Sequence, residues 1–314
     1  MGRPDGRRIT KEAPMYLLAP QLMTERNDAM NMITVDIPVE PLRKYMNAKR
    51  KEGKHISHMA LVMAAYVRAA HEFPCLNRFV IRKRIYEHDD VAVSLVVLRP
   101  GTTGNDSTMA KLYFNGEDTV FSVQDQIDAY VEKNSSGAQE DENGLDKLMA
   151  IVLKLGFILD FIGWLIRTLD RFGLLPRFLL DILPFHASLL ITNLASIRTN
   201  HIYHHVYNFG STSVGIAMGN LREIPKRGRG GQIELVRSIP LGVVMDERIA
   251  SGHYFALAFA RIQELLANPE LLEQPWDGKP IVEPLDWEER KEWYAKRAKK
   301  FAKRDARRMK AYEK

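Results

Sequence analysis

One segment near residue 245 constrains the fold more than any other part of the chain. The apolar run from Ile239 to Met245 has the length and the β-branched content of a buried strand. The charged turn 246–251 follows, then Gly252, and then a helical stretch that ends in the apolar segment 265–272. Strands and helices are mixed along the rest of the chain, with strands clustered late, and this pattern predicts an α+β fold.

The remaining elements are expected from hydrophobic periodicity and from turn residues. Ser57 is a suitable N-cap for a helix over 60–72 that is apolar on nearly every face, which predicts that this helix is buried. Further helices are expected after Pro38 and over 119–133. Strands are expected over 32–37, 79–85, 90–98, 110–114, 188–194, 212–219 and 233–236.

The composition is that of a soluble protein of 314 residues with 46% hydrophobic and 27% charged residues. The single cysteine, Cys75, excludes a disulfide framework within the chain, so a reducing, cytoplasmic setting is expected. The segment 1–14 is polar and basic, lacks the apolar run of a signal peptide, and is expected to form an N-terminal arm.

The net charge of +6 comes from the C-terminal end of the chain. Residues 286–314 contain 12 Lys/Arg and 6 Asp/Glu, so the remainder is close to neutral. Segment 274–314 is therefore expected to be a basic helical tail docked on the body. Binding of anionic lipid headgroups is the alternative, and nucleic acid is not expected as a partner.

The segment 145–185 is unusually apolar but is interrupted by charged residues. No window in it reaches the roughly 18 uninterrupted apolar residues of a membrane span, and Gly173 and Pro176 divide it into two helices. Two interpretations remain open. It forms a helical hairpin packed on the body or on a neighbouring subunit, or it forms an interfacial membrane helix or a lid over an acyl site.

Five segments in the same order resemble the catalytic domain of the 2-oxo acid dehydrogenase acyltransferases, which share a fold with chloramphenicol acetyltransferase. The resemblance covers roughly residues 15–135 and 186–273, and the insertion 145–185 is longer than the corresponding connection in that family. The His-x-x-x-Asp-Gly motif of the family falls on Glu247, Ser251 and Gly252, so this chain has a degenerate motif of a stand-alone form. The five segments are 69–77, 85–93, 191–194, 208–219 and 246–272.

This resemblance implies a two-layer fold that assembles as a homotrimer, with residues 15–273 as the acyltransferase-like domain. It also implies active sites in channels between subunits. Coenzyme A would enter such a channel from one end and an acyl carrier from the other. The resemblance does not extend to a lipoyl domain or to a subunit-binding domain, and no metal is expected. The substrate would be a small-molecule thioester.

The residue at position 247 raises a question about the chemistry. Acyl transfer to a thiol requires a base for the S–H proton, and in the family a histidine at this position is that base. Because a free glutamate has a pKa about 2 units below that of histidine, the change adds roughly 3 kcal/mol to proton transfer, or about a hundredfold in rate. Burial would raise the glutamate pKa and reduce this deficit. Alternatively, Glu247 pairs with an arginine such as Arg248 or Arg26.

Three other positions carry the remaining family roles. Thr192 corresponds to the hydroxyl residue that stabilises the oxyanion from the neighbouring subunit, although an ordinary β-branched strand residue is the alternative. Ser251 replaces a carboxylate that shapes the loop, which suggests relaxed geometry there. Gly252 is retained, as expected for a backbone position with unusual dihedral angles or a close approach.

Histidines at 201, 204 and 205 form a second cluster. A structural role is favoured for His201, His204 and His205, with ring N–H groups bonded to the backbone. A metal site would need further ligands, and none is obvious nearby. Alternatively, His204 or His205 substitutes for the missing base; His253 is a further candidate, but its side chain is expected to point elsewhere. A coenzyme-A-dependent acyltransferase is therefore the leading hypothesis, and a non-catalytic trimeric scaffold or ligand-binding protein is the alternative.

Overall fold

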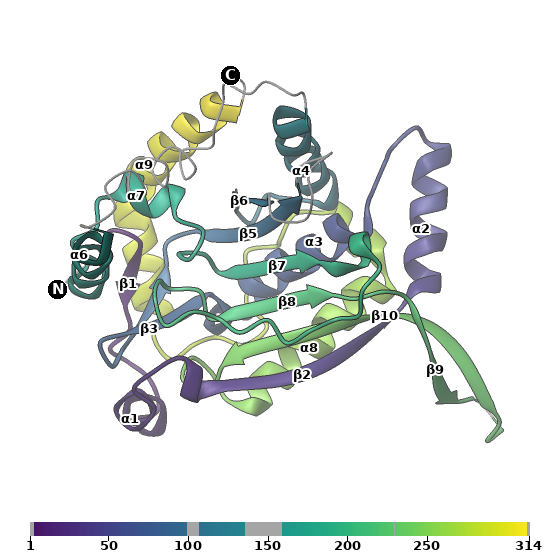
Figure 1. The fold of residues 1–314 in the computed structure, drawn as a ribbon, viewed down its shortest axis with the longest axis horizontal. Coiled ribbons are helices and arrows are strands. Elements are labelled where there is room, and N and C mark those ends of the chain that lie inside the picture. The colour runs from purple at the N-terminus through teal and green to yellow at the C-terminus, as the bar shows by residue number, and fades with distance from the viewer. Residues whose placement is uncertain (1–2, 99–106, 136–158, 229, 313–314) are drawn as a thin grey trace.

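The computed structural model of the chain describes residues 3–98, 107–135, 159–228 and 230–312. Its centre is a seven-stranded mixed sheet in the order β2-β10-β8-β7-β5-β6, with β9 paired to the outer part of β10 (Figure 1). The β5–β7 and β7–β8 pairs are parallel and the others antiparallel. The strands are β2 (Met30–Pro38), β5 (Val91–Leu98), β6 (Ser107–Phe114), β7 (Leu189–Asn193), β8 (Val214–Met218), β9 (Arg222–Arg227) and β10 (Ile233–Asp246).

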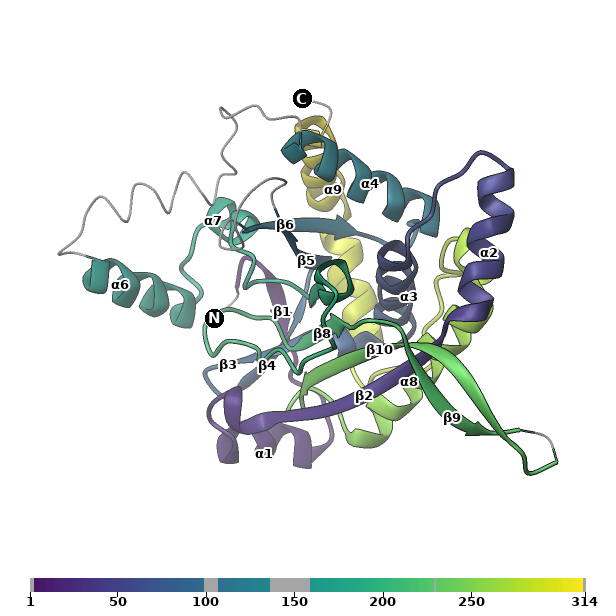
Figure 2. The ribbon, with the colours of Figure 1, turned by 45° about the vertical axis from the view of Figure 1, so that its right-hand side comes forward.

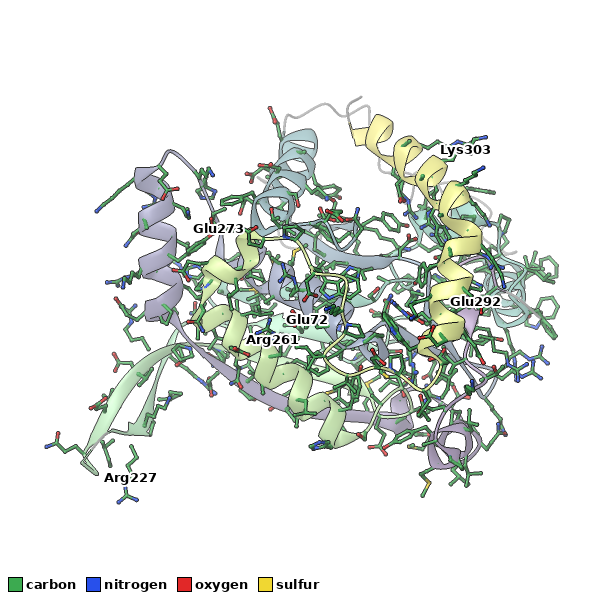
Figure 3. The ribbon with its side chains drawn as sticks, turned by 180° about the vertical axis from the view of Figure 1, so that it is seen from behind. Glu72, Arg227, Arg261, Glu273, Glu292 and Lys303 are labelled. Atoms are coloured by element: carbon green, nitrogen blue, oxygen red, sulfur yellow. The ribbon has the colours of Figure 1, made fainter. Side chains whose placement is uncertain are left out.

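Helices α3 (His58–Glu72) and α8 (Gly252–Ala267) pack side by side and cover one face of this sheet (Figures 1 and 3). The Ser57 hydroxyl accepts a hydrogen bond from the Ala60 amide at 3.1 Å, which confirms the predicted N-cap. Helix α3 is buried along almost its whole length, as predicted. Arg261 on α8 donates to Glu72 on α3 at 2.7 Å, and this ion pair joins the two helices near the centre of Figure 3.

Other helices surround this two-layer unit. Helix α1 (Pro14–Leu22) precedes β2, α2 (Val39–Lys51) follows it, and α4 (Val120–Ser135) follows β6. The hairpin of β9 and β10 extends away from the body at the lower right of Figure 2. The pattern predicted two short strands over 233–236 and 239–245, whereas β10 is one continuous strand, because its outer half pairs with β9 and its inner half with β2 and β8.

A second, three-stranded sheet is built from β1 (Gly6–Arg8), β4 (Arg84–His88) and β3 (Arg78–Ile81) in that order. The prediction of one strand over 79–85 was wrong, because the chain reverses at Arg82 and Lys83, which both have positive φ. Neither residue is a usual hairpin-turn residue, so the pattern gave no signal for the turn. The basic segment 1–14 enters the fold here, since β1 pairs with β4 and Arg7 is buried.

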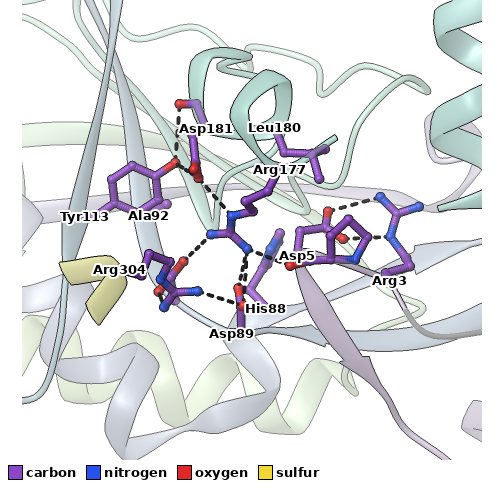
Figure 4. A network of polar contacts seen from close by, with 12 residues as sticks. Arg3, Asp5, His88, Asp89, Ala92, Tyr113, Arg177, Leu180, Asp181 and Arg304 are labelled. Atoms are coloured by element: carbon purple, nitrogen blue, oxygen red, sulfur yellow. Dashed lines mark hydrogen bonds and ion pairs between the residues drawn. The ribbon is translucent and has the colours of Figure 1, made fainter. Parts of the chain in front are cut away.

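The C-terminal helix α9 (Trp287–Tyr312) packs on the body as predicted for the tail. Its arginines bind carboxylates at the start of β5 (Figure 4). Arg304 bonds Asp89 at 2.8 Å and also bonds Asp90, while Arg308 bonds Asp90 at 3.1 Å. Arg177 binds the same two aspartates at 3.0 and 2.6 Å, so these charges join α9 to the insertion.

The described part of the predicted insertion 145–185 forms two helices, α6 (Leu159–Phe172) and α7 (Arg177–Ile182), with Gly173 and Pro176 between them as expected. Residues 145–158 lie outside the described residues. Helix α6 lies at the edge of the molecule (Figure 2) and exposes Phe161 and Trp164, each at 59%. Within the described residues, no helix is long and apolar enough to cross a membrane.

Candidate functional site

The turn after β10 is held by both neighbouring strands. The Asp246 amide donates to the Ser213 carbonyl at 2.9 Å, and the Glu247 amide donates to the Ala29 carbonyl at 2.8 Å. The backbone of this turn is therefore fixed between β2 and the segment leading into β8.

Asp246 and Arg248 form a buried ion pair beneath this turn. The Arg248 Nε and Nη2 atoms donate to the two carboxylate oxygens at 2.8 and 2.7 Å. The Arg26 guanidinium approaches the same carboxylate, with Nε 3.6 Å from Oδ2, and all three side chains are almost fully buried. One carboxylate is thus shared by two guanidinium groups, which leaves one buried positive charge without a matching negative charge.

The environment of Arg26 reflects this imbalance. Burial lowers the pKa of Arg26 to about 10, with Arg248 contributing repulsion and Asp246 opposing the shift. Its Nη1 and Nη2 atoms donate to the carbonyls of Tyr207 at 2.5 Å and Gly210 at 3.1 Å. Its buried Nε atom has no hydrogen-bond partner among the described residues. Carbonyl groups orient the guanidinium but carry no charge that would neutralise it.

Glu247 is half-buried and does not pair with either arginine. The Glu247 Oε2 atom accepts a hydrogen bond of 2.6 Å from the Asn31 side chain on β2. The interpretation that Glu247 pairs with an arginine such as Arg248 or Arg26 was wrong, because both arginines are bound by Asp246. The carboxylate therefore keeps an accessible side and one fixed hydrogen bond.

Ser251 and Gly252 begin helix α8. The Ser251 hydroxyl accepts from the Tyr254 amide at 3.0 Å, so Ser251 is the N-cap of the helix rather than part of a relaxed loop. Gly252 does not have the positive φ that would require glycine, and a Cβ atom placed on it would meet nothing within 4 Å. The expected conformational need for glycine at 252 is therefore wrong.

Thr192 lies on β7, and its side chain is buried. Its Oγ1 atom has no hydrogen-bond partner among the described residues. Such a hydroxyl is uncommon, because burying a polar group without a partner costs about 1–3 kcal/mol. The Asn193 Oδ1 atom next to it is in the same situation. This end of β7 thus contains two buried polar atoms whose hydrogen-bonding capacity is not used within the described residues.

Thr192 and Glu247 are far apart within one chain. Thr192 faces Ala217 on β8, and Ala217 faces Gly242 on β10, five residues before Glu247. At about 3.3 Å per residue and about 4.8 Å per strand, the two positions are separated by roughly 16 Å along the sheet and 10 Å across it. A single subunit cannot place both side chains on one reacting carbonyl.

The histidine cluster lies on an irregular segment that crosses the sheet face opposite α3 and α8. A Cβ atom on Gly242 would lie 2.2 Å from the Ile202 carbonyl oxygen, so this crossing requires glycine in β10. The His201 Nε2 atom is 3.0 Å from the Thr34 hydroxyl, and the His204 Nδ1 atom is 3.1 Å from the His205 carbonyl.

Only the His204 ring contacts a backbone carbonyl, whereas the His201 ring contacts a side-chain hydroxyl, so the structural role of the cluster stays a prediction. His204 crosses the sheet beside Gly215, which faces Val244, three residues before Glu247. His205 is exposed, and so is His253 at the start of α8. Among the residues that the structure describes, no group of three or more His, Cys, Asp or Glu side chains could hold a metal ion.

Among the described residues, one large cavity lies away from the turn after β10 and another lies beside it. One, of about 740 Å³, lies between α4 and α9 and is lined by residues such as His71, Trp276 and Tyr294, so it contains neither Glu247 nor Thr192. The other, of about 570 Å³, lies next to the turn after β10 and includes Arg26 and Arg248 in its walls. The second cavity was not predicted, because it joins segments from residues 24 to 248 in sequence.

The arrangement of the sheet and helices is shared with known structures. The chain has the two-layer fold of the acyltransferase catalytic cores of 2-oxo acid dehydrogenase complexes. The α+β, chloramphenicol acetyltransferase-like fold predicted from the sequence is thereby confirmed, and so is the resemblance on which that prediction depended.

Three solved structures illustrate the similarity. A probable dihydrolipoamide acetyltransferase from Listeria monocytogenes matches with a TM-score of 0.52 at 15% identity, over 82% of this chain and 95% of that chain. The cubic core of a pyruvate dehydrogenase multienzyme complex matches with a TM-score of 0.52 at 13% identity, over 84% and 94%. A truncated catalytic core of the 2-oxoacid dehydrogenase complex from Thermoplasma acidophilum matches with a TM-score of 0.50 at 12% identity, over 84% and 99%. No model of a known protein family matches the sequence, and no characterised protein matches it by sequence.

Proposed function

We propose that the chain is a coenzyme-A-dependent acyltransferase that works as a homotrimer. The proposal is supported by the shared fold together with two side chains: the buried Thr192 hydroxyl, which has no hydrogen-bond partner among the described residues, and the half-buried Glu247 carboxylate. Their separation within one chain is what a site shared between two subunits requires, with Glu247 from one subunit and Thr192 from the next.

The proposed reaction transfers an acyl group between two thiols. The Glu247 carboxylate takes the proton from the thiol of coenzyme A, and the thiolate attacks the carbonyl carbon of the acyl carrier's thioester. The Thr192 hydroxyl of the neighbouring subunit donates a hydrogen bond to the oxyanion of the tetrahedral intermediate. Collapse breaks the bond to the carrier sulfur, which recovers the proton from Glu247, so atoms and charge balance.

One surface feature supports assembly into trimers. The β9–β10 hairpin extends beyond the sheet (Figure 2) and exposes Ile233 at 76% and Leu235 at 65%. Exposed apolar side chains on a projecting hairpin are typical of a contact with another subunit. Light scattering is expected to give three times the chain mass of 36.0 kDa, and Ile233→Asp with Leu235→Asp is expected to reduce it.

Two variants test the catalytic roles. Thr192→Val removes the hydroxyl while keeping the shape, so it should lower turnover by about a hundredfold or more through loss of the oxyanion donor. The same change should leave stability equal or higher, because it removes a buried hydroxyl without a partner. Glu247→Gln should lower turnover by a similar factor, while Glu117→Gln, at an exposed position away from the hairpin, serves as the matched control.

Mixing the two inactive variants tests the sharing of the site. If subunits exchange freely, about a quarter of the interfaces pair an intact Glu247 with an intact Thr192, and activity should return to about a quarter of the original. Absence of any recovery, with exchange verified by mass, would reject the shared site. Absence of coenzyme A binding at millimolar concentration would reject the enzyme itself.

A non-catalytic trimeric ligand-binding protein is the second candidate, and the Asn31 hydrogen bond to Glu247 favours it. This alternative predicts that Glu247→Gln leaves every binding property unchanged.

For location, we propose the cytoplasm. The apolar face of α6 supports peripheral attachment to an anionic membrane, together with the basic segment 286–314. Flotation with vesicles that contain anionic lipid tests this attachment, and protein that stays at the bottom of the gradient would reject it.

A further inference from the structure

The cavity of about 570 Å³ beside the turn after β10 is lined by more positively than negatively charged side chains. Two of the charged side chains in its walls are carboxylates, Glu25 and Asp170, and Asp170 is already bound to Arg3 at 2.8 Å and to His186 at 3.1 Å. Six are cations: Arg26, Arg82, Lys83, Arg167, Arg171 and Arg248. An excess of positive charge around a concave surface raises the local concentration of anions.

The deepest of these cations lack matched partners. Arg26 and Arg248 share the single carboxylate of Asp246, and the Arg26 Nε atom is buried without a hydrogen-bond partner among the described residues. An unbalanced buried charge is unfavourable unless another ion neutralises it. An anion seated in the cavity would supply that missing negative charge.

The outer cations come from two elements that meet at the mouth of the cavity. Arg82 lies in the β3–β4 turn, and its guanidinium lies 4.4 Å from the centre of the Phe172 ring at the end of α6. Arg167 and Arg171 are one turn apart on α6, both exposed, and neither has an ion pair with a described residue. These guanidinium groups are free to form paired hydrogen bonds with a ligand.

We propose that this cavity binds a phosphate-bearing anion with two or more negative charges. Guanidinium groups bind phosphate through two parallel hydrogen bonds, and several of them around one cavity match a diphosphate better than a single carboxylate. The volume is in the range of small-molecule sites, so a group attached to the phosphates also fits. The site is distinct from Glu247 and Thr192, and anion binding there does not depend on acyl transfer.

The same chemistry could come from a soluble nucleotide-like molecule or from a phospholipid headgroup. The exposed Phe161 and Trp164 on α6 would lie against the acyl chains in the second case. Binding of inorganic pyrophosphate, measured by titration calorimetry on the full chain at low salt, tests the site without assuming either source. Competition by coenzyme A or by phosphatidylglycerol vesicles then assigns the source.

Paired variants make the test specific. Arg167→Ser with Arg171→Ser should weaken pyrophosphate binding by about tenfold or more. Arg43→Ser with Arg50→Ser on α2 removes the same charge from exposed helix positions elsewhere and should change affinity less than twofold. No pyrophosphate binding at 10 mM, a limit of roughly 2.7 kcal/mol in affinity, would overturn the proposal. Equal weakening in both pairs of variants would overturn it as well, because binding would then follow net charge alone.

Discussion

Replacing Asp246 by asparagine should be among the most damaging single changes near the turn after β10. The carboxylate is buried with only 1% of its side chain exposed, and it is the shared partner of Arg26 and Arg248. Asp246→Asn would leave two guanidinium charges buried side by side. Breaking one buried ion pair costs about 3–5 kcal/mol, and the presence of a second cation places this variant in the upper part of that range.

Removing Arg248 instead gives the informative comparison. Arg248→Met abolishes several hydrogen bonds, including one of 3.1 Å to the Met23 carbonyl, but it leaves Arg26 and Asp246 as a matched pair. We expect a cost of about 1–3 kcal/mol, less than that of Asp246→Asn, because the net buried charge falls to zero.

Urea unfolding followed by circular dichroism measures both free energies. All variants should be compared at one protein concentration, because the apparent stability of an oligomer depends on it. A loss below about 1 kcal/mol for Asp246→Asn, or an equal loss for Arg248→Met, would refute the argument from charge balance.

Three further changes have simple readouts. Gly242→Ala should destabilise the chain by about 1–3 kcal/mol, since the new Cβ atom would lie 2.2 Å from the Ile202 carbonyl oxygen. The segment that carries the histidines should also exchange its amide hydrogens faster, and an unchanged exchange pattern would contradict this. Ser251→Ala should cost about 1 kcal/mol in thermal unfolding through loss of the α8 N-cap, whereas Ser251→Asp should restore it.

Burial lowers the pKa of His88 to about 4, below the ordinary value of 6.5. The unfolded chain therefore binds a proton between pH 6.5 and pH 4 that the folded chain does not. Stability is fully present above pH 6.5 and falls as the pH decreases, by about 2 kcal/mol between pH 7 and pH 5. His88→Asn should remove this part of the pH dependence in urea unfolding curves, and an unchanged slope would count against it.

The elements that follow a regular pattern were predictable from the sequence. Helix α3 is apolar on all sides because it is packed between the sheet, α8 and α4, and Ser57 marks its first turn. The division of the insertion at Gly173 and Pro176 could also be predicted, because both residues interrupt a helix for local reasons. These features are determined by residues close together in the sequence, and the hydrophobic pattern and the turn residues of a segment report on such local structure.

The missed features depend on contacts between distant segments. The partner of Glu247 is Asn31, which is 216 residues away, and the cavity joins the β3–β4 turn to α6. One signal was available: Asp246 and Arg248 are two residues apart at a strand end, so their side chains point the same way and can pair. This spacing predicts that Arg248 forms an ion pair with Asp246 and not with Glu247.

The small sheet also has a consequence for the order in which the chain folds during synthesis. Arg7 on β1 is made early, yet it binds Asp286 at 2.5 Å, and its other partner, Glu87, also binds Arg290 at 2.6 Å. At about 5–20 residues per second, the last of these partners emerges on the order of tens of seconds after the first. The charged side chains of β1 and β4 therefore lack their C-terminal partners until the end of synthesis. They remain hydrated during that time, and charge on an edge strand protects the nascent chain from premature association.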